Sequence, residues 1–251
     1  KNILFDMKVF IPGNFHDYGN LFNSDSTYTV KEREDLFKLL PENIKINSIL
    51  ELGCADGKNL IFFKKKLGVS SENVVGVDIC SNLTEENDNF KFYHQNAEKF
   101  FEINNSDFDL ILFSDVIEHI FNPWKILSKS RVSLSKNGLC LLSVPNLQNL
   151  HYLNSIIGGN FFYNKTGLFD ETHIRFFTLN SLKVYLEQLN YKIINTGWRA
   201  DKSLQPLREK LLAELENKKE VYMESGDIKI KINIENINNY FSQQILICFS
   251  L

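Results

Sequence analysis

One short stretch, from Ile49 to Gly57, limits the folds open to this chain more than any other. Its apolar residues Ile49–Leu52 predict a β-strand that contains an acidic residue, Glu51. A turn with two glycines follows, and the apolar run after Asn59 predicts a helix. Such a strand, turn and helix let backbone approach a ligand closely and leave helix N–H groups free. The stretch therefore predicts a binding site.

A second strand, predicted at Val74–Val77, ends in Asp78. A carboxylate at that point of a doubly wound sheet can accept hydrogen bonds from both hydroxyls of a ribose. Pyrophosphate binding requires the spacing Gly-x-Gly-x-x-Gly, whereas here three residues, one of them Asp56, separate Gly53 from Gly57. The sequence therefore favours a positively charged nucleoside cofactor over a dinucleotide such as NAD.

These residues resemble the first motif of class I S-adenosylmethionine (SAM) methyltransferases, Glu/Asp-x-Gly-x-Gly-x-Gly. The resemblance implies SAM as cofactor and S-adenosylhomocysteine as product. The cofactor contacts that it implies at the first two strands are Glu51, Gly53, Cys54, Ala55, Gly57, Asp78 and Ile79. Ala55 stands where the family usually has glycine, so we expect the turn to avoid a positive φ at this residue. A βαβ unit without a ligand is the alternative.

The order of the later elements agrees with that family. Strands are predicted at Phe90–His94, Phe108–Phe113, Leu139–Val144, Tyr191–Thr196 and Gln243–Leu251. Their alternation with helical stretches predicts an α/β fold: a doubly wound, mostly parallel seven-stranded Rossmann-like sheet, whose last strand is antiparallel in the family. Ligands bind such sheets at the carboxyl ends of the strands. The resemblance implies further cofactor contacts there, at Asn96, Ala97, Ser114 and Asp115.

We expect one methyltransferase domain over residues 1–251, with three additions to its sheet. They are an N-terminal helical segment that closes over the cofactor (1–47), a substrate lid after the fifth strand (145–179), and a helix and β-arm inserted before the last strand (201–240). Because the chain begins with Lys1 rather than Met, we expect a native start or another domain to be missing.

Two of these additions carry more specific expectations. In the N-terminal segment, Tyr18 or Tyr28 is a candidate contact for the methionine carboxylate, and Lys31–Leu40 is predicted to be an amphipathic helix. The helix predicted at Ser203–Lys219 has apolar residues at helical spacing. It suits packing on this domain or against a second subunit of a homodimer. The alternating residues Asp227–Ile234 predict a half-exposed strand or hairpin arm.

The lid has its own pattern, Ser-x-Pro-Asn … Gly-Leu-x-Asp-x-Thr-His-x-Arg-Phe-Phe-Thr, which ends at Thr178. It resembles a methyltransferase subgroup common among bacterial surface-polysaccharide and capsule enzymes. The resemblance implies a small carbohydrate-linked acceptor, such as a sugar or sugar nucleotide. His173 is then a candidate for accepting a hydroxyl proton, and Arg175 for binding an anionic group. Alternatively, both side chains only tie the lid to Asp170 and the following helix.

The segment from Ser114 to His119 allows three interpretations. Ser114 or Asp115 can cap a helix, with Glu118 completing a capping box. His119 can act as a base or position a hydroxyl acceptor, because the family holds the methyl group near this point. Finally, Asp115, Glu118 and His119 resemble an acidic-x-x-Glu-His arrangement that binds a divalent metal in ubiquinone-pathway and small-RNA methyltransferases. Mg²⁺ or Mn²⁺ suits that set, although we do not favour a metal.

Composition excludes some functions. A net charge of −3 and a pI near 6.0 argue against a dedicated nucleic-acid binder. No apolar run approaches the roughly 20 residues of a membrane span. The cysteines Cys54, Cys80, Cys140 and Cys248 lack metal or disulfide spacing, which favours a cytoplasmic protein with reduced thiols.

We therefore expect a SAM-dependent methyltransferase that acts on a hydroxyl of a small polar molecule. Four alternatives remain. An N-methyltransferase and a metal-assisted O-methyltransferase of another metabolite would use the same fold and cofactor. A nicotinamide-dependent oxidoreductase would use the same sheet, although the glycine spacing argues against it. A catalytically silent module that binds SAM or a partner protein would keep the motifs without the reaction.

Overall fold

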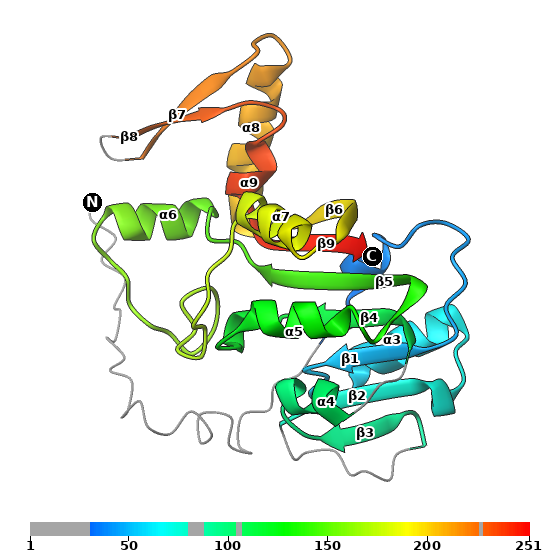
Figure 1. Cartoon of the computed structure of the whole chain (residues 1–251). Coiled ribbons are helices and arrows are strands. Elements are labelled where there is room, and N and C mark those ends of the chain that lie inside the picture. Colours follow the sequence, from blue (N-terminus) through cyan, green and yellow to red (C-terminus); the bar gives the residue numbers. More distant parts are fainter. Residues whose placement is uncertain (1–30, 80–87, 104–106, 226–227) are drawn as a thin grey trace.

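The computed structural model describes residues 31–79, 88–103, 107–225 and 228–251. Seven strands form one sheet in the order β3-β2-β1-β4-β5-β9-β6, and β7 and β8 form a separate hairpin (Figure 1). The strands are β1 (Ile49–Leu52), β2 (Val74–Asp78), β3 (Lys91–His94), β4 (Phe108–Ser114), β5 (Leu134–Pro145), β6 (Lys192–Ala200), β7 (Val221–Ser225), β8 (Ile228–Ile232) and β9 (Ser242–Ser250).

The first five strands are parallel, and β9 is antiparallel to both β5 and β6. This confirms the predicted doubly wound, mostly parallel sheet. Strands β1 and β2 are buried along their whole length, as expected for strands covered on both faces. In this register Glu51 lies opposite Gly76, and Asp78 opposite His94. The carboxyl ends of β1, β2 and β4 therefore meet at one edge of the sheet.

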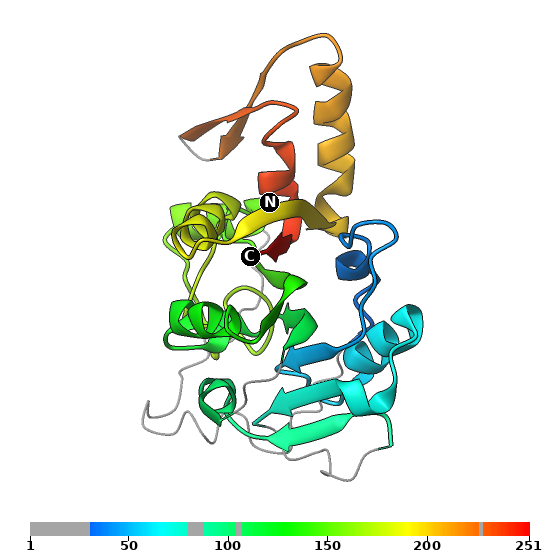
Figure 2. The same cartoon turned by 45° about the vertical axis from the view of Figure 1, so that its right-hand side comes forward.

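Helices cover both faces of the sheet (Figure 2). One apolar core includes side chains of α4, α5 and α7, and the other includes side chains of α2 and α3. The helices are α2 (Glu34–Phe37), α3 (Lys58–Leu67), α4 (Ala97–Ile103), α5 (Pro123–Ser130), α6 (Leu150–Ile157), α7 (Leu179–Gln188), α8 (Gln205–Leu215) and α9 (Ile237–Phe241), with 3-10 turns η1 (Ser71–Asn73), η2 (Ile117–His119) and η3 (Lys202–Leu204). No helix among the described residues could span a bilayer.

Local sequence explains where several helices begin. Asn122 accepts a hydrogen bond from the Lys125 N–H and is followed by proline at the first position of α5. Thr178 and Ser181 form a capping box at the start of α7, which confirms the predicted cap. The predicted helix Lys31–Leu40 is shortened to α2, because Pro41 disfavours helical backbone before it and Arg33 turns into the interior.

The chain between β6 and β9 builds a protrusion beyond the sheet (Figure 1). Helices α8 and α9 and the β7–β8 hairpin share a third apolar core, to which Leu150 of α6 contributes. Leu204 and Leu211 are buried in that core, so the apolar side of the predicted Ser203–Lys219 helix packs within its own chain. Exposed ion pairs, such as Lys229 with Glu224, cover the outer side of the hairpin.

Candidate cofactor and acceptor site

The turn after β1 is built from glycines that admit no side chain. Gly53 and Gly57 both have a φ of +72°, which is strained for any residue with a Cβ. A Cβ on Gly57 would lie 2.4 Å from the Phe90 ring, and one on Gly53 would lie 2.8 Å from Val116. Gly57 is also the residue that precedes α3. The turn is thus held close to the end of β4.

Ala55 corrects our expectation for this turn, because its φ is +45°. Its N–H donates a 2.7 Å hydrogen bond to Oδ2 of Asp78. A bond to a carboxylate is among the stronger hydrogen bonds and offsets the strain of about 1 kcal/mol or more that a left-handed residue carries. The same bond orients Asp78 at the end of β2, beside the turn.

Glu51 is the most unusual group at this edge. Its side chain is only 1% exposed, and Asn59 donates a 2.6 Å hydrogen bond to Oε1. The second oxygen, Oε2, is buried without a hydrogen-bond partner among the described residues. Burial raises the pKa of Glu51 to about 7, against the lowering effect of the bond from Asn59. A cationic group placed beside Oε2 would satisfy this carboxylate.

Other predicted cofactor residues lie along the same edge in different settings. Ser114 ends β4 and is buried, whereas Asn96 is exposed immediately before α4. Ile79, just after β2, is 45% exposed, and Ala97 is half-buried. Cys54 is 1% exposed, and its Sγ lies 2.8 Å from where a Cβ on Gly76 would be. Cys54 can therefore offer a ligand its backbone only.

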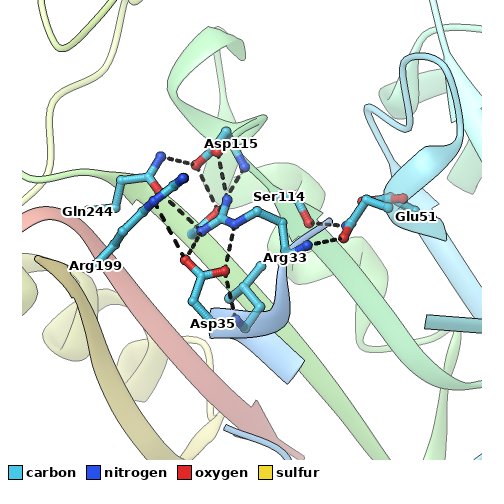
Figure 3. Close-up of polar contacts among 10 residues, drawn as sticks. Arg33, Asp35, Glu51, Ser114, Asp115, Arg199 and Gln244 are labelled. Atoms are coloured by element: carbon cyan, nitrogen blue, oxygen red, sulfur yellow. Dashed lines mark hydrogen bonds and ion pairs between the residues drawn. The ribbon is translucent and has the colours of Figure 1, made fainter. Parts of the chain in front are cut away.

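Arg33 is a site residue that sequence reasoning missed. Its guanidinium is buried and donates hydrogen bonds to Asp115 Oδ2 at 2.7 Å and Ser143 Oγ at 2.8 Å (Figure 3). It also donates to both oxygens of Asp35. The Arg33 backbone N–H donates to Asn59, the residue that holds Glu51. Arg33 thus links Asn59, and through it Glu51, to the end of β4.

Asp115 departs from one of our interpretations. It has a φ of +52°, and its carboxylate accepts hydrogen bonds from Arg33, Ser143 and Gln244. The predicted capping box is wrong, because these bonds occupy the carboxylate and the residue before η2 is Val116, which makes no side-chain cap. The metal set of Asp115, Glu118 and His119, which we did not favour, stays a hypothesis; the Asp115 carboxylate in it already accepts hydrogen bonds from Arg33 and Ser143.

The structure instead brings His173 of the lid to Glu118 and His119. One ligand atom from each of the three side chains lies within 4.8 Å of the others, and the two imidazole centroids are 4.7 Å apart. The Glu118 carbonyl accepts hydrogen bonds from the N–H groups of Ile174 and Arg175, which attach the lid to η2. Burial, with a smaller effect of His173, lowers the pKa of His119 to about 4, so this imidazole is neutral at pH 7.

Among the described residues, the Arg175 side chain bonds to the chain just after η2 rather than to Asp170. Its guanidinium donates to the carbonyl oxygens of Phe121 and Ile174 and lies 5.2 Å from the centroid of the exposed Phe121 ring. Asp170 instead accepts from the N–H and hydroxyl of Thr172. The suggested tie between Arg175 and Asp170 is therefore replaced by one to Phe121.

Comparison with known proteins identifies the family. A family described as "Methyltransferase domain" matches residues 27–196, which is more than half of the chain. This chain belongs to that family. A crystal structure of a SAM-dependent methyltransferase from Archaeoglobus fulgidus has a TM-score of 0.58 and 18% identity to this methyltransferase domain, and the match covers 86% of this chain and 91% of that one.

Two further comparisons define the range of similar proteins. A mitochondrial ubiquinone biosynthesis O-methyltransferase of Dictyostelium discoideum is 23% identical over 192 residues, which are 66% of this chain and 59% of that protein. A crystal structure of a possible histamine N-methyltransferase from Thermotoga maritima has a TM-score of 0.54, 14% identity, and coverage of 93% and 88%. The chain spans 50% to 62% of the length of its curated relatives.

Proposed function

We propose that this methyltransferase domain binds SAM at the carboxyl ends of β1 and β2 and transfers its methyl group to a hydroxyl of a small polar acceptor. The observation that carries the proposal is Glu51, a buried carboxylate beside a glycine turn, with one oxygen that has no hydrogen-bond partner among the residues the structure describes. SAM carries an ammonium group that fits such an oxygen. A dinucleotide would instead bring its pyrophosphate to a strand and turn that carry the acidic residues Glu51 and Asp56.

Different residues of this chain would contact different parts of the cofactor. Gly53 and Gly57 keep the turn free of side chains, so that a ligand can approach the backbone. Asp78 is held by the Ala55 N–H at one oxygen and is suited to the ribose hydroxyls. Asn96 has an amide that can both donate to and accept from an adenine ring. Arg33 and Asn59 keep Glu51 and Asp115 in fixed positions.

SAM, when bound, supplies an electrophilic methyl group on a sulfonium. That methyl group would pass to the hydroxyl oxygen of the acceptor, with S-adenosylhomocysteine as the leaving group and the hydroxyl proton going to solvent. With a pKa of about 4, His119 is a weak base, so we assign it a hydrogen bond that positions the hydroxyl, together with His173. Most of the rate enhancement then comes from positioning and from exclusion of water by the lid.

The acceptor that we favour is a sugar or sugar nucleotide. The lid pattern that ends at Thr178 supports it, and Arg175 lies beside η2 where an anionic group of the acceptor can reach it. The ubiquinone biosynthesis relatives, which are named as O-methyltransferases, support transfer to oxygen. The structural neighbour named as a possible N-methyltransferase makes amines the second class to test.

The test is formation of S-adenosylhomocysteine from SAM with panels of sugar nucleotides, dihydroxy-aromatic compounds and amines. We expect turnover with a hydroxyl acceptor, a strong loss of SAM affinity in Asp78→Ala, and a lower kcat with little change in SAM affinity in His119→Ala. His151→Ala is the matched control, because His151 is half-exposed and bonds to Ser203 outside this site. Turnover with amines alone would overturn the assignment to oxygen, and unchanged SAM affinity in Asp78→Ala would overturn the ribose contact.

A further inference from the structure

We infer that Glu118, His119 and His173 form a binding site for one divalent transition-metal ion at the acceptor end of the pocket. The role of that ion in the reaction rests on the proposed function, whereas its binding does not. Glu118 and His119 belong to η2, and His173 belongs to the lid, 54 residues after His119 in the chain. Their ligand atoms all lie within 4.8 Å of one another, so a single ion can contact all three after small movements.

The Glu118 side chain provides an observation that points independently to a ligand. It is 1% exposed, and both of its carboxylate oxygens are buried without a hydrogen-bond partner among the described residues. A buried carboxylate normally accepts several hydrogen bonds, because leaving it unsatisfied costs several kcal/mol. A metal ion bound to one or both oxygens would remove this deficit.

Each of the two histidines has a backbone carbonyl oxygen beside its Nδ1, which favours the tautomer that can bind a metal through Nε2. Nδ1 of His119 lies 3.2 Å from the carbonyl oxygen of Thr172, and Nδ1 of His173 lies 2.9 Å from that of Leu168. A carbonyl oxygen can only accept, so each Nδ1 carries the proton and each Nε2 carries the lone pair. Metal-binding histidines commonly donate their second ring N–H to a backbone carbonyl in this way.

The donor set indicates which ions suit the site. Two imidazole nitrogens and one carboxylate favour ions such as Mn²⁺, Fe²⁺, Co²⁺ or Zn²⁺, whereas Mg²⁺ prefers oxygen ligands alone. The set therefore differs from the Asp115, Glu118 and His119 set suggested by sequence, both in its members and in the metal that it selects. Three protein ligands leave coordination positions open.

An ion at this point would contact the acceptor directly. A bound ion would lower the pKa of a hydroxyl held at an open position, and the oxygen would become a better nucleophile once its proton passed to solvent. The two imidazoles then act through the ion. Because His173 comes from the lid and Glu118 from η2, ion binding also joins the lid to the end of β4.

The experiment uses the full chain, freed of metal with a chelator and kept without SAM. Co²⁺ and Zn²⁺ are titrated by calorimetry, and the visible absorption of bound Co²⁺ reports nitrogen and oxygen coordination. We expect one ion per chain, a weaker response to Mg²⁺, and a rise in melting temperature with Zn²⁺. In His173→Ala and Glu118→Gln we expect affinity to fall by roughly 100-fold or more, since loss of a supporting group alone costs up to about 100-fold.

His151→Ala is the control for adventitious binding by a surface histidine, and it should keep the wild-type affinity. The melting temperatures of the metal-free variants separate loss of a ligand from loss of folding. No specific binding of Co²⁺ or Zn²⁺ by the wild type, or binding that both His173→Ala and Glu118→Gln retain, would overturn the site. SAM affinity measured on the same metal-free sample tests the proposed function separately, so failure of one leaves the other standing.

Discussion

Two glutamates, Glu51 at the end of β1 and Glu118 in η2, are equally buried but differently satisfied. Each side chain is 1% exposed, and burial is the main cause of a raised pKa in both. Within the described part of the chain, Glu51 receives a hydrogen bond from Asn59 at one oxygen and none at the other. Within the same part, Glu118 receives no hydrogen bond at either oxygen, but two imidazoles lie beside it.

The difference indicates which kind of ligand each carboxylate can bind. Glu51 is held by a neutral amide and keeps one oxygen for a single cationic hydrogen-bond donor, such as an ammonium group. Glu118 keeps two oxygens and adjoins two nitrogen lone pairs, which is a ligand set for a metal ion. A fold that retains two such uncompensated carboxylates loses stability at both, and we attribute that loss to function.

The largest expected effect concerns stability against pH without any ligand. Because burial raises the pKa of Glu51 from 4.5 to about 7, its stabilising contribution is complete below about pH 4.5 and is lost as pH rises through about 7. We expect Glu51→Gln to be more stable than the wild type at pH 8, by about 3 kcal/mol in denaturant unfolding, and to match it near pH 4. Glu72→Gln, at an exposed position, is the control. Equal stability of Glu51→Gln and wild type at both pH values would refute the buried ionised state.

The second prediction compares how substitution of each glutamate changes the binding of SAM and of Zn²⁺. At pH 8 we expect Glu51→Gln to weaken SAM binding by about 2 kcal/mol, or roughly 30-fold, because the ammonium group loses its charged partner. Glu118→Gln should leave SAM affinity within about twofold and instead weaken Zn²⁺ binding by roughly 100-fold or more. Calorimetry of both variants with both ligands gives four affinities. If Glu118→Gln lost as much SAM affinity as Glu51→Gln, the two glutamates could not be assigned to different ligands.

The third effect is the pH dependence of SAM affinity. An ammonium group binds the ionised form of Glu51, whose population falls about tenfold between pH 8 and pH 6 when the pKa is about 7. We therefore expect SAM to bind about tenfold more weakly at pH 6 than at pH 8. The dependence should be absent in Glu51→Gln, and a dependence that this variant retains would assign the titration to another group.

The smallest expected effect comes from removing the hydrogen bond to Glu51, which leaves its carboxylate without a side-chain donor from Asn59, as Glu118 is without a donor among the described residues. The hydrogen bond from Asn59 to Oε1 lowers the pKa of Glu51. Asn59→Ala removes this bond, so the pKa of Glu51 should rise further. We expect a several-fold weaker SAM affinity at pH 7 that recovers at higher pH. Asn73→Ala, at an exposed position in η1, is the control. If affinity stayed low at every pH, the role of Asn59 would lie in the shape of the pocket.

Most of the fold could be predicted from patterns of residues that are close together in the sequence. The apolar runs of β1, β2 and β4 and the glycines of the first turn act over a few residues, so the sheet and the position of Glu51 and Asp78 could be predicted. Contacts between distant residues could not. The partners of Arg33 at Asp115 and Ser143 are 82 and 110 residues away, and a single arginine in a charged run gives no signal of burial.

The same limit applies to the residues that follow β4. The spacing of Asp115, Glu118 and His119 suggested one cluster, but spacing could not reveal that Arg33 and Gln244 occupy Asp115. Nor could it reveal that the lid brings His173 to the other two. The sign of φ at Ala55 was missed because it depends on the hydrogen bond to Asp78 from the neighbouring strand.

The most direct test of the central claim is a calorimetric titration of the metal-free chain at pH 8 with SAM, S-adenosylhomocysteine and NADH. The arrangement of Glu51, Asp78 and the glycine turn predicts that both adenosyl ligands bind at one site per chain and that NADH does not. Binding of NADH, or failure of both adenosyl ligands to bind, would contradict the assignment of this pocket to SAM.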